Sequence, residues 1–265
     1  MNYGIIVKVL GNIIILEGAS MILPLLVSII YRQEDSAAFA ICIVLTGVLG
    51  FAMSRFPKRS ETIKIKEGLV IVTLGWILIS VFGSMPFIFS GAVDSFIDAL
   101  FETVSGFTTT GATIIDDVEL LPKGLLFWRS FTHWIGGMGI LVFTVAFLPV
   151  MGVGSFQLYK AESPGPTVDK IVPRLRDTAK ILYITYAGMT VLEIILLLLG
   201  GMSLFESAVY TFGSVGTGGF STRNASVGAF SSTYIHIIIS VFMIISGINF
   251  QLYYAIFKGK IKEVL

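Results

Sequence analysis

Charged residues are scarce in this chain: they make up 13% of its 265 residues, and the formal net charge is only +1. Soluble domains carry roughly twice that charged fraction. A chain that is 55% hydrophobic is therefore predicted to be a multi-pass membrane protein, surrounded by lipids and with little material outside the bilayer. A net charge so close to zero also gives no reason to expect a nucleic acid as a partner.

Cysteine and histidine are almost absent as well. The single cysteine, Cys42, lies in an apolar run, so the sequence excludes a disulfide framework and a cysteine-based metal site. The two histidines, His133 and His236, fall on different predicted spans, which gives a transition-metal site little support. No serine has a plausible histidine and aspartate partner, and the glycine-rich runs lack the strand–helix setting of a nucleotide site. We predict that the chain is not an enzyme and holds no covalent cofactor.

Long apolar runs alternate with polar connections, and each run is long enough to cross a bilayer, which takes about 20 residues. The connections 55–67 and 156–180 and the C-terminal tail are rich in lysine and arginine, so we place them and both termini in the cytoplasm. The connections 31–36, 91–124 and 201–232 contain few basic residues and are expected outside. The predicted spans are 4–30, 37–54, 68–90, 125–151, 180–200 and 233–257.

The two longer outer connections resemble each other. Each begins with a stretch of helical character, 95–106 or 203–214, that is too short to span, and each continues into a glycine- and threonine-rich segment. The shared pattern G-x-x-x-T-G-[AG] aligns Gly111 with Gly218, which lies 107 residues later. The chain after residue 67 is therefore predicted to be an internal repeat of span, half-helix, Gly/Thr segment and span.

The Gly/Thr segments have the chemistry of a site for a monovalent cation. Irregular backbone at membrane depth is tolerated only where protein surrounds it or where it lines a wet cavity. Glycine permits positive φ and so lets successive carbonyls turn to one side. Carbonyl oxygens can replace the hydration shell of a cation, while the half-helix points its negative end at the same place. Neither segment contains a carboxylate, which a divalent-ion site would use, so the pattern favours a large ion such as potassium.

The simpler interpretation is that glycine and threonine only allow close helix packing, as small residues do in membrane bundles. A single occurrence would favour that interpretation, but two occurrences on the same side, each after a non-spanning helix, favour a pore loop. Asp116 and Asp117 follow the first segment and are predicted to form an acidic outer mouth that concentrates cations.

Four motifs carry a resemblance to a known family and cover most of residues 95–222. They are FETVSGFTTTGAT (101–113), WRSFTHWIGGMGI (128–140), FQLYKAESPGPTVDKIVPRLRDTAKILYITY (156–186) and SVGTGGFST (214–222). With these motifs the sequence resembles the Trk/Ktr/HKT superfamily of potassium transporters, specifically the Trk-type membrane subunit.

The resemblance implies an all-α membrane protein: two extra N-terminal helices, then two span–pore-helix–filter–span repeats of a pseudo-fourfold, potassium-channel-like pore in the cytoplasmic (inner) membrane. It implies that potassium is the substrate and that filter backbone carbonyls coordinate it at Thr109, Thr110, Gly111, Gly216, Thr217 and Gly218. The expected divisions are an N-terminal hairpin (1–54), repeat one (68–152), a cytoplasmic connection (153–179), repeat two (180–257) and a cytoplasmic tail (258–265).

The sequence departs from the family pattern in one respect, because the family closes its filter with four repeats and this chain has two. Either the chain is the first half of a longer protein, or two such halves pair to complete the ring; we expect the first. A cytoplasmic, nucleotide-binding regulatory subunit is the partner that the resemblance implies. The alternative function is a non-conducting assembly or interaction protein that keeps the half-pore fold.

Several ionisable residues in the predicted spans require a partner or a role. His133 could be a proton-linked switch, but we expect a histidine that is bonded to a neighbouring helix. For Glu17 and Glu193 we expect interhelical hydrogen bonds, because an unpaired carboxylate in a membrane is costly. Nothing in the sequence brings His133 and Glu193 together as an intramembrane enzyme would require. Lys123 and Arg129 are expected to be interfacial anchors, although Arg129 could instead bond the backbone behind the filter.

Overall fold

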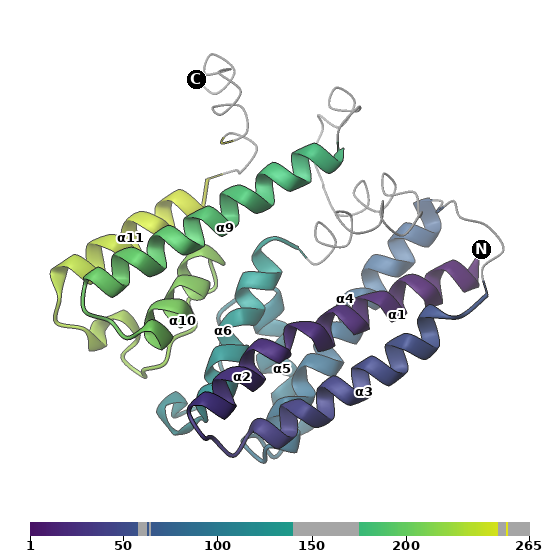
Figure 1. Ribbon diagram of the computed structural model, residues 1–265, viewed down its shortest axis with the longest axis horizontal. Coiled ribbons are helices and arrows are strands. Elements are labelled where there is room, and N and C mark those ends of the chain that lie inside the picture. The colour runs from purple at the N-terminus through teal and green to yellow at the C-terminus, as the bar shows by residue number, and fades with distance from the viewer. Residues whose placement is uncertain (58–62, 64, 140–174, 249–252, 254–265) are drawn as a thin grey trace.

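The computed structural model describes residues 1–57, 63, 65–139, 175–248 and 253, and every regular element in this part of the chain is a helix (Figure 1). The all-helical fold class is therefore confirmed. The predicted tail (258–265) and nearly all of the predicted connection 153–179 lie outside the described residues.

The long helices match the first predicted spans. Helices α1 (Tyr3–Ser20) and α2 (Ile22–Ile30) form one apolar stretch, interrupted at Met21. Pro24 lies in the first turn of α2 and has no N–H to bond the carbonyl one turn earlier, which explains an interruption at this point. Three more helices in the described part of the chain are long and apolar enough to cross a membrane: α3 (Ser36–Ser54), α4 (Ile65–Phe89) and α9 (Leu175–Leu199).

Two short helices, α5 (Phe96–Phe107) and α10 (Leu204–Val215), occupy the predicted half-helices, shifted by one residue at each end. Each has 12 residues, about 18 Å of helix, which is too short for the roughly 30 Å hydrocarbon core. A serine cap starts each one, because Ser95 Oγ accepts from the Asp98 N–H (3.4 Å) and Ser203 Oγ from the Glu206 N–H (3.2 Å).

The remaining helices are α6 (Lys123–Gly137) and α11 (Thr233–Ser246), which lie at the predicted spans 125–151 and 233–257. Both helices end within the described residues, at Gly137 and Ser246, well before the predicted ends of these spans. Two 3₁₀ turns, η1 (Val118–Leu120) and η4 (Ser226–Ala229), lie in the connections 91–124 and 201–232 that are predicted to be outside.

The N-terminal helices pack on each other through small residues. Helices α1 and α3 run side by side, and α4 lies against them (Figure 1). A Cβ atom on Gly11 would lie 2.7 Å from the Gly50 carbonyl oxygen, and a Cβ on Gly50 would lie 2.7 Å from the Gly11 carbonyl oxygen. The two backbones can approach this closely only because neither residue has a side chain.

Helix α6 lies between the two half-helices, in contact with α5 on one side and with α10 on the other. Aromatic rings fill both contacts: Phe107 of α5 meets Trp128 (6.2 Å between ring centroids), and Phe212 of α10 meets Phe127 (5.4 Å) and Phe131 (5.3 Å). Helix α10 is flanked on its other sides by α9 and α11 (Figure 1). The buried core thus joins the two half-helices through a single helix.

Candidate functional site

The two Gly/Thr segments follow the same backbone course after their half-helices. We name residues 108–113 the first segment and residues 216–221 the second. Thr109 and Thr217 both have positive φ (54° and 59°), and so do Gly111 (73°) and Gly219 (86°). A threonine in the left-handed region is uncommon and strained, so its occurrence two residues after each half-helix identifies a specific turn that both segments adopt.

The turns also share their hydrogen bonds. The Thr109 N–H donates to the Gly106 carbonyl at 3.1 Å, and the Thr217 N–H donates to the Ser214 carbonyl at the same distance. The next N–H, of Thr110 or of Gly218, reaches one residue further back into its own half-helix, at 3.0 and 2.9 Å. These bonds keep the last carbonyls of the half-helices occupied.

The shared geometry corrects the predicted alignment by one residue. The caps, the half-helix bounds and both positive-φ residues correspond at a spacing of 108 residues rather than 107. Gly111 is therefore equivalent to Gly219, and Gly216 is the C-terminal cap of α10, equivalent to Thr108. The prediction aligned identical residues, Thr110-Gly111 with Thr217-Gly218. The structure instead aligns the residues that have the same backbone conformation. Gly219 is the residue that this reasoning missed.

The two segments meet at their glycines. A Cβ atom added to Gly111 would overlap the carbonyl oxygen of Gly218, so the first segment passes directly beside the backbone of the second. Gly111 also has positive φ. Glycine is therefore favoured at this position for two reasons, the close contact and the backbone conformation. Of the residues predicted to form the site, the structure thus brings together Gly111 of the first segment and Gly218 of the second.

Helix α6 supports both segments from behind through residues without side chains. A Cβ on Gly136 would overlap the carbonyl of Phe107 at the end of α5. A Cβ on Gly137 would lie 3.1 Å from Gly216 Cα at the end of α10 and 2.7 Å from the Tyr186 hydroxyl. Gly136 and Gly137 therefore allow α6 to pack closely against the ends of both half-helices.

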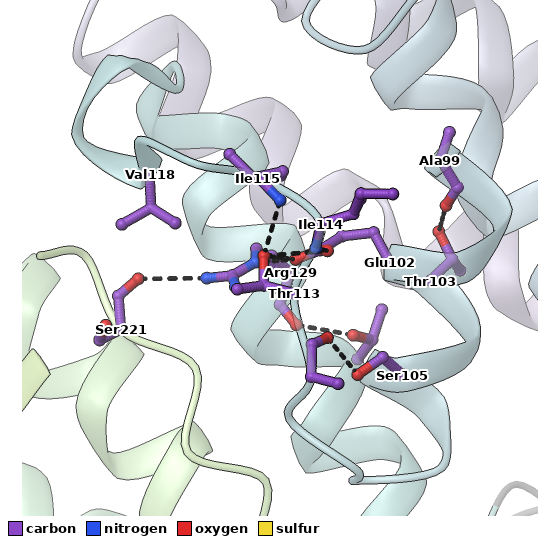
Figure 2. Close-up of polar contacts among 12 residues, drawn as sticks. Ala99, Glu102, Thr103, Ser105, Thr113, Ile114, Ile115, Val118, Arg129 and Ser221 are labelled. Atoms are coloured by element: carbon purple, nitrogen blue, oxygen red, sulfur yellow. Dashed lines mark hydrogen bonds and ion pairs between the residues drawn. The ribbon is translucent and has the colours of Figure 1, made fainter. Parts of the chain in front are cut away.

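Arg129 of α6 connects the two segments (Figure 2). Its Nε forms a buried ion pair with Glu102 of α5, and its Nη1 donates to the carbonyl of Ser221 at 3.4 Å. Glu102 in turn accepts from the Thr113 hydroxyl (3.0 Å) and from the Ile114 N–H (3.0 Å). Arg129 is thus no interfacial anchor; it bonds backbone behind the segments, which was the second of the two predicted roles.

Phe220 in the second segment is held between two side chains of α6. Its ring lies 4.0 Å from the His133 ring, nearly parallel to it, and 3.6 Å from the Arg129 guanidinium carbon. A Cβ on Gly218 would overlap the His133 ring. Within the described part of the chain, His133 makes this stacking contact in place of the expected hydrogen bond to a neighbouring helix.

One of the two aspartates of the predicted acidic mouth, Asp117, is hydrogen-bonded within the protein. Both Asp116 and Asp117 are exposed. However, Asp117 Oδ1 accepts from the side-chain amide of Asn224 at 2.8 Å, and Asn224 Oδ1 accepts from the Val118 N–H at 3.0 Å. These bonds join the two connections that follow the first and second segments.

The two buried glutamates behave differently. Glu193 of α9 accepts a hydrogen bond from Ser214 of α10 at 2.6 Å, so the predicted interhelical bond is confirmed. Among the described residues, neither carboxylate oxygen of Glu17 has a hydrogen-bond partner, so the same prediction is wrong for Glu17. Its carboxylate lies instead beside Gly83 of α4, where a Cβ atom would be 2.9 Å from Glu17 Oε1.

Comparison with known proteins places this geometry in context. The family model for TrkH, a cation transport protein, matches residues 32–264. The Trk system potassium uptake protein TrkH of Escherichia coli (strain K12) is 41% identical over 268 residues, which cover 100% of this chain and 55% of that protein. The Trk system potassium uptake protein TrkG of the same strain is 37% identical, over 97% of this chain and 53% of that protein.

A solved structure agrees with these matches. The crystal structure of the potassium transporter TrkH from Vibrio parahaemolyticus superposes with a TM-score of 0.81 at 35% identity, over 98% of this chain and 53% of that one. The chain thus spans about half the length of the relatives that it matches.

Proposed function

This chain belongs to the TrkH family of cation transport proteins, a family of transporters rather than enzymes, and from this membership we propose that it forms part of a potassium-uptake pore. The relatives named above are potassium uptake proteins, and four helices in the described part of this chain are long and apolar enough to cross a membrane. Potassium is the transported substrate in this proposal.

The single observation that carries the proposal is the contact between the two Gly/Thr segments. Each segment follows the C-terminal end of a half-helix, contains no carboxylate and turns its backbone through a threonine and a glycine with positive φ. Two such segments that touch at Gly111 and Gly218 would present backbone carbonyls to one place. Uncharged oxygens there suit a large monovalent cation, since they can replace its water without the strong binding that a carboxylate would add.

The lining of the proposed filter follows the spacing of 108. In each segment it comprises the strained threonine, the residue after it and the second positive-φ residue: Thr109, Thr110 and Gly111 in the first segment and Thr217, Gly218 and Gly219 in the second. Gly216, at the end of α10, leads into the filter.

Two of the four filter quarters are provided by this chain, and the rest would come from the remainder of a longer native chain or from a second copy. We place the protein in the cytoplasmic membrane with both termini inside, because the connections 55–67 and 156–180 and the C-terminal tail are rich in lysine and arginine, which favours the cytoplasmic side. A cytoplasmic nucleotide-binding subunit is the proposed regulator.

Rubidium uptake into cells that lack their own potassium transport tests the proposal. The 265-residue chain is compared with a four-repeat version, called the full-length protein below, and with a full-length Gly111→Ser variant, with sodium as the competing ion. We expect uptake by the full-length protein and its loss in the Gly111→Ser variant, because a side chain there meets the Gly218 carbonyl.

Two outcomes would contradict parts of the proposal. Uptake that survives Gly111→Ser with unchanged discrimination against sodium would remove the segment from the filter. A full-length protein that reaches the membrane but takes up no rubidium would favour the non-conducting assembly protein. Uptake by the 265-residue chain alone would show that paired halves suffice.

A further inference from the structure

The start of α6 is capped by residues from a distant part of the chain. Helix α6 begins at Lys123 and follows Pro122, whose side chain cannot accept a hydrogen bond, so the helix has no cap of its own. The cap comes from the turn between α2 and α3: Asp35 Oδ2 accepts from the Leu125 N–H at 2.8 Å, and Gln33 Oε1 accepts from the Lys123 N–H at 3.3 Å. Both bonds join residues 90 positions apart.

The side chain of Asp35 caps α6 rather than its own helix, α3. It is the N-cap residue of α3 by position, yet its side chain makes no capping bond there. The carboxylate is 1% exposed and is held by the hydroxyl of Ser28. A Cβ on Gly124 would overlap Asp35 Oδ2, so the first turn of α6 approaches closely only because residue 124 is glycine. A buried carboxylate at a helix N-terminus also meets the positive end of the helix dipole.

The same turn contacts the second half-helix. The ring of Tyr31 lies 5.6 Å from the ring of Phe205, which is in the first turn of α10, in an edge-to-face arrangement. The ammonium of Lys123 lies 3.8 Å from the centre of the Tyr31 ring and 5.4 Å from that of Phe205. The turn therefore holds α6 at a point where it also meets α10.

The position of α6 along its axis decides where its functional side chains lie. Arg129 and His133 follow Leu125 at intervals of four residues, so they lie about 6 and 12 Å further along the helix. They are the side chains that hold Phe220, and Arg129 also holds Ser221 and Glu102. A helix that slides or frays at its first turn would move these contacts together.

We propose that Asp35 is a positioning residue for the filter: by capping α6 it fixes the helix that braces both Gly/Thr segments, and so the extra N-terminal hairpin contributes to ion selectivity. This proposal rests on the potassium-uptake function proposed above.

The test uses the full-length protein with Asp35→Ala, Asp35→Asn and the control Glu34→Ala. Glu34 lies in the same turn, carries the same charge and is exposed. One measurement is the ratio of rubidium to sodium uptake, and the other is hydrogen exchange in the peptide that covers the first turns of α6. We expect Asp35→Ala to speed exchange in the first turn of α6 about fivefold, the effect of one lost cap, and to lower the uptake ratio. Asp35→Asn can still accept from Leu125 and should be intermediate, while Glu34→Ala should change neither.

Three results would overturn the proposal. If Asp35→Ala speeds exchange but leaves the uptake ratio unchanged, the cap is structural only. If exchange does not change, there is no cap. If the wild-type protein takes up no rubidium, the proposed transport function fails and the role in selectivity fails with it, while the exchange result still tests the cap by itself. Should Asp35→Ala not fold, Ser28→Ala removes the hydroxyl that holds the carboxylate and must give the same two changes, in smaller measure.

Discussion

The two half-helix units have the same backbone but are held by different side chains. In the first unit (α5 with the first segment), the segment is tied to its own half-helix, since Glu102 accepts from Thr113 and Ile114 and Ser105 donates to the Ala112 carbonyl at 2.6 Å. In the second unit (α10 with the second segment), Tyr210 replaces Glu102 and bonds the more distant Ser226 carbonyl at 3.1 Å. The first unit is braced from within.

The second unit is braced from outside. Its segment is held by α6, through the stack on Phe220 and the bond to Ser221, and its half-helix is held by Glu193 of α9 through Ser214. Arg129 takes part in both units, because it pairs with Glu102 of the first and donates to the Ser221 carbonyl of the second. The comparison teaches that one backbone conformation can be maintained by unrelated contacts, provided that a shared helix fixes the two units relative to each other.

The largest expected effect comes from the residue that only the first unit has. Glu102→Gln leaves the Arg129 guanidinium buried without its countercharge and should lower the free energy of unfolding by about 3–5 kcal/mol. Tyr210→Phe, at the equivalent position of the second unit, removes one hydrogen bond and should cost about 1 kcal/mol. Chemical denaturation in detergent measures both. The double variant Glu102→Gln/Arg129→Met should recover part of the loss; equal costs for the two single variants would mean that the units are braced alike.

The equivalent glycines Gly111 and Gly219 should differ in how much an alanine substitution destabilises the protein. Gly111→Ala places a methyl group on the Gly218 carbonyl and also strains the backbone, for a combined cost of about 3 kcal/mol. Gly219 has open space around its Cβ position, so Gly219→Ala should cost only the strain, about 1–2 kcal/mol. Denaturation and rubidium uptake of the two full-length variants are compared. A larger loss for Gly219→Ala would contradict the contact between the segments.

The two units can also be compared by exchanging Ser105 and its equivalent, Gly213. Each of these residues lies beside an equivalent carbonyl, that of Ala112 in the first unit and that of Phe220 in the second. Ser105 donates to the Ala112 carbonyl, whereas its equivalent, Gly213, has the Phe220 carbonyl 2.7 Å from where a Cβ would lie. Gly213→Ser should therefore destabilise by about 2 kcal/mol through overpacking, and Ser105→Gly by about 1 kcal/mol through the lost hydrogen bond. If Gly213→Ser were instead stabilising, a hydroxyl would serve in both units and the difference between them would be incidental.

The smallest effect is expected at the surface of the second unit. Arg223 pairs with Glu206 at 3.3 Å and Glu119 at 3.7 Å, and its side chain is 48% exposed. Exposed ion pairs contribute about 0–1 kcal/mol, so Arg223→Ala should hardly change unfolding or uptake. It is the control for the variants above, and a loss of more than about 1 kcal/mol would show that the outer connections matter more than exposure suggests.

Local features of the fold could be read from the sequence. The half-helices lie within one residue of their predicted bounds because serine caps and the Gly/Thr runs that follow are short-range signals. The predicted spacing between the units was wrong by one residue because identical residues were aligned. The positions with positive φ, Thr109 and Thr217, would have given the right spacing, but the sequence has no pattern that marks them.

The braces could not be predicted, because they join residues that the folded chain brings together. Glu102 and Arg129 are 27 residues apart, and Asp35 and Leu125 are 90 apart. An acidic residue in a half-helix and an arginine in the next span were the only signals for the first pair. The glutamates in the spans are instructive for the same reason: Glu193 meets a serine and Glu17 meets Gly83, and nothing within either helix distinguishes them.

The ion pair of Arg129 also bears on how the protein enters its membrane. An arginine costs up to about 3 kcal/mol to insert into a membrane helix, depending on its depth. Glu102 is synthesised 27 residues before Arg129, so the acid is already available when the base leaves the ribosome. The order of the two charges along the chain therefore means that the partner of Arg129 enters the membrane before Arg129 does.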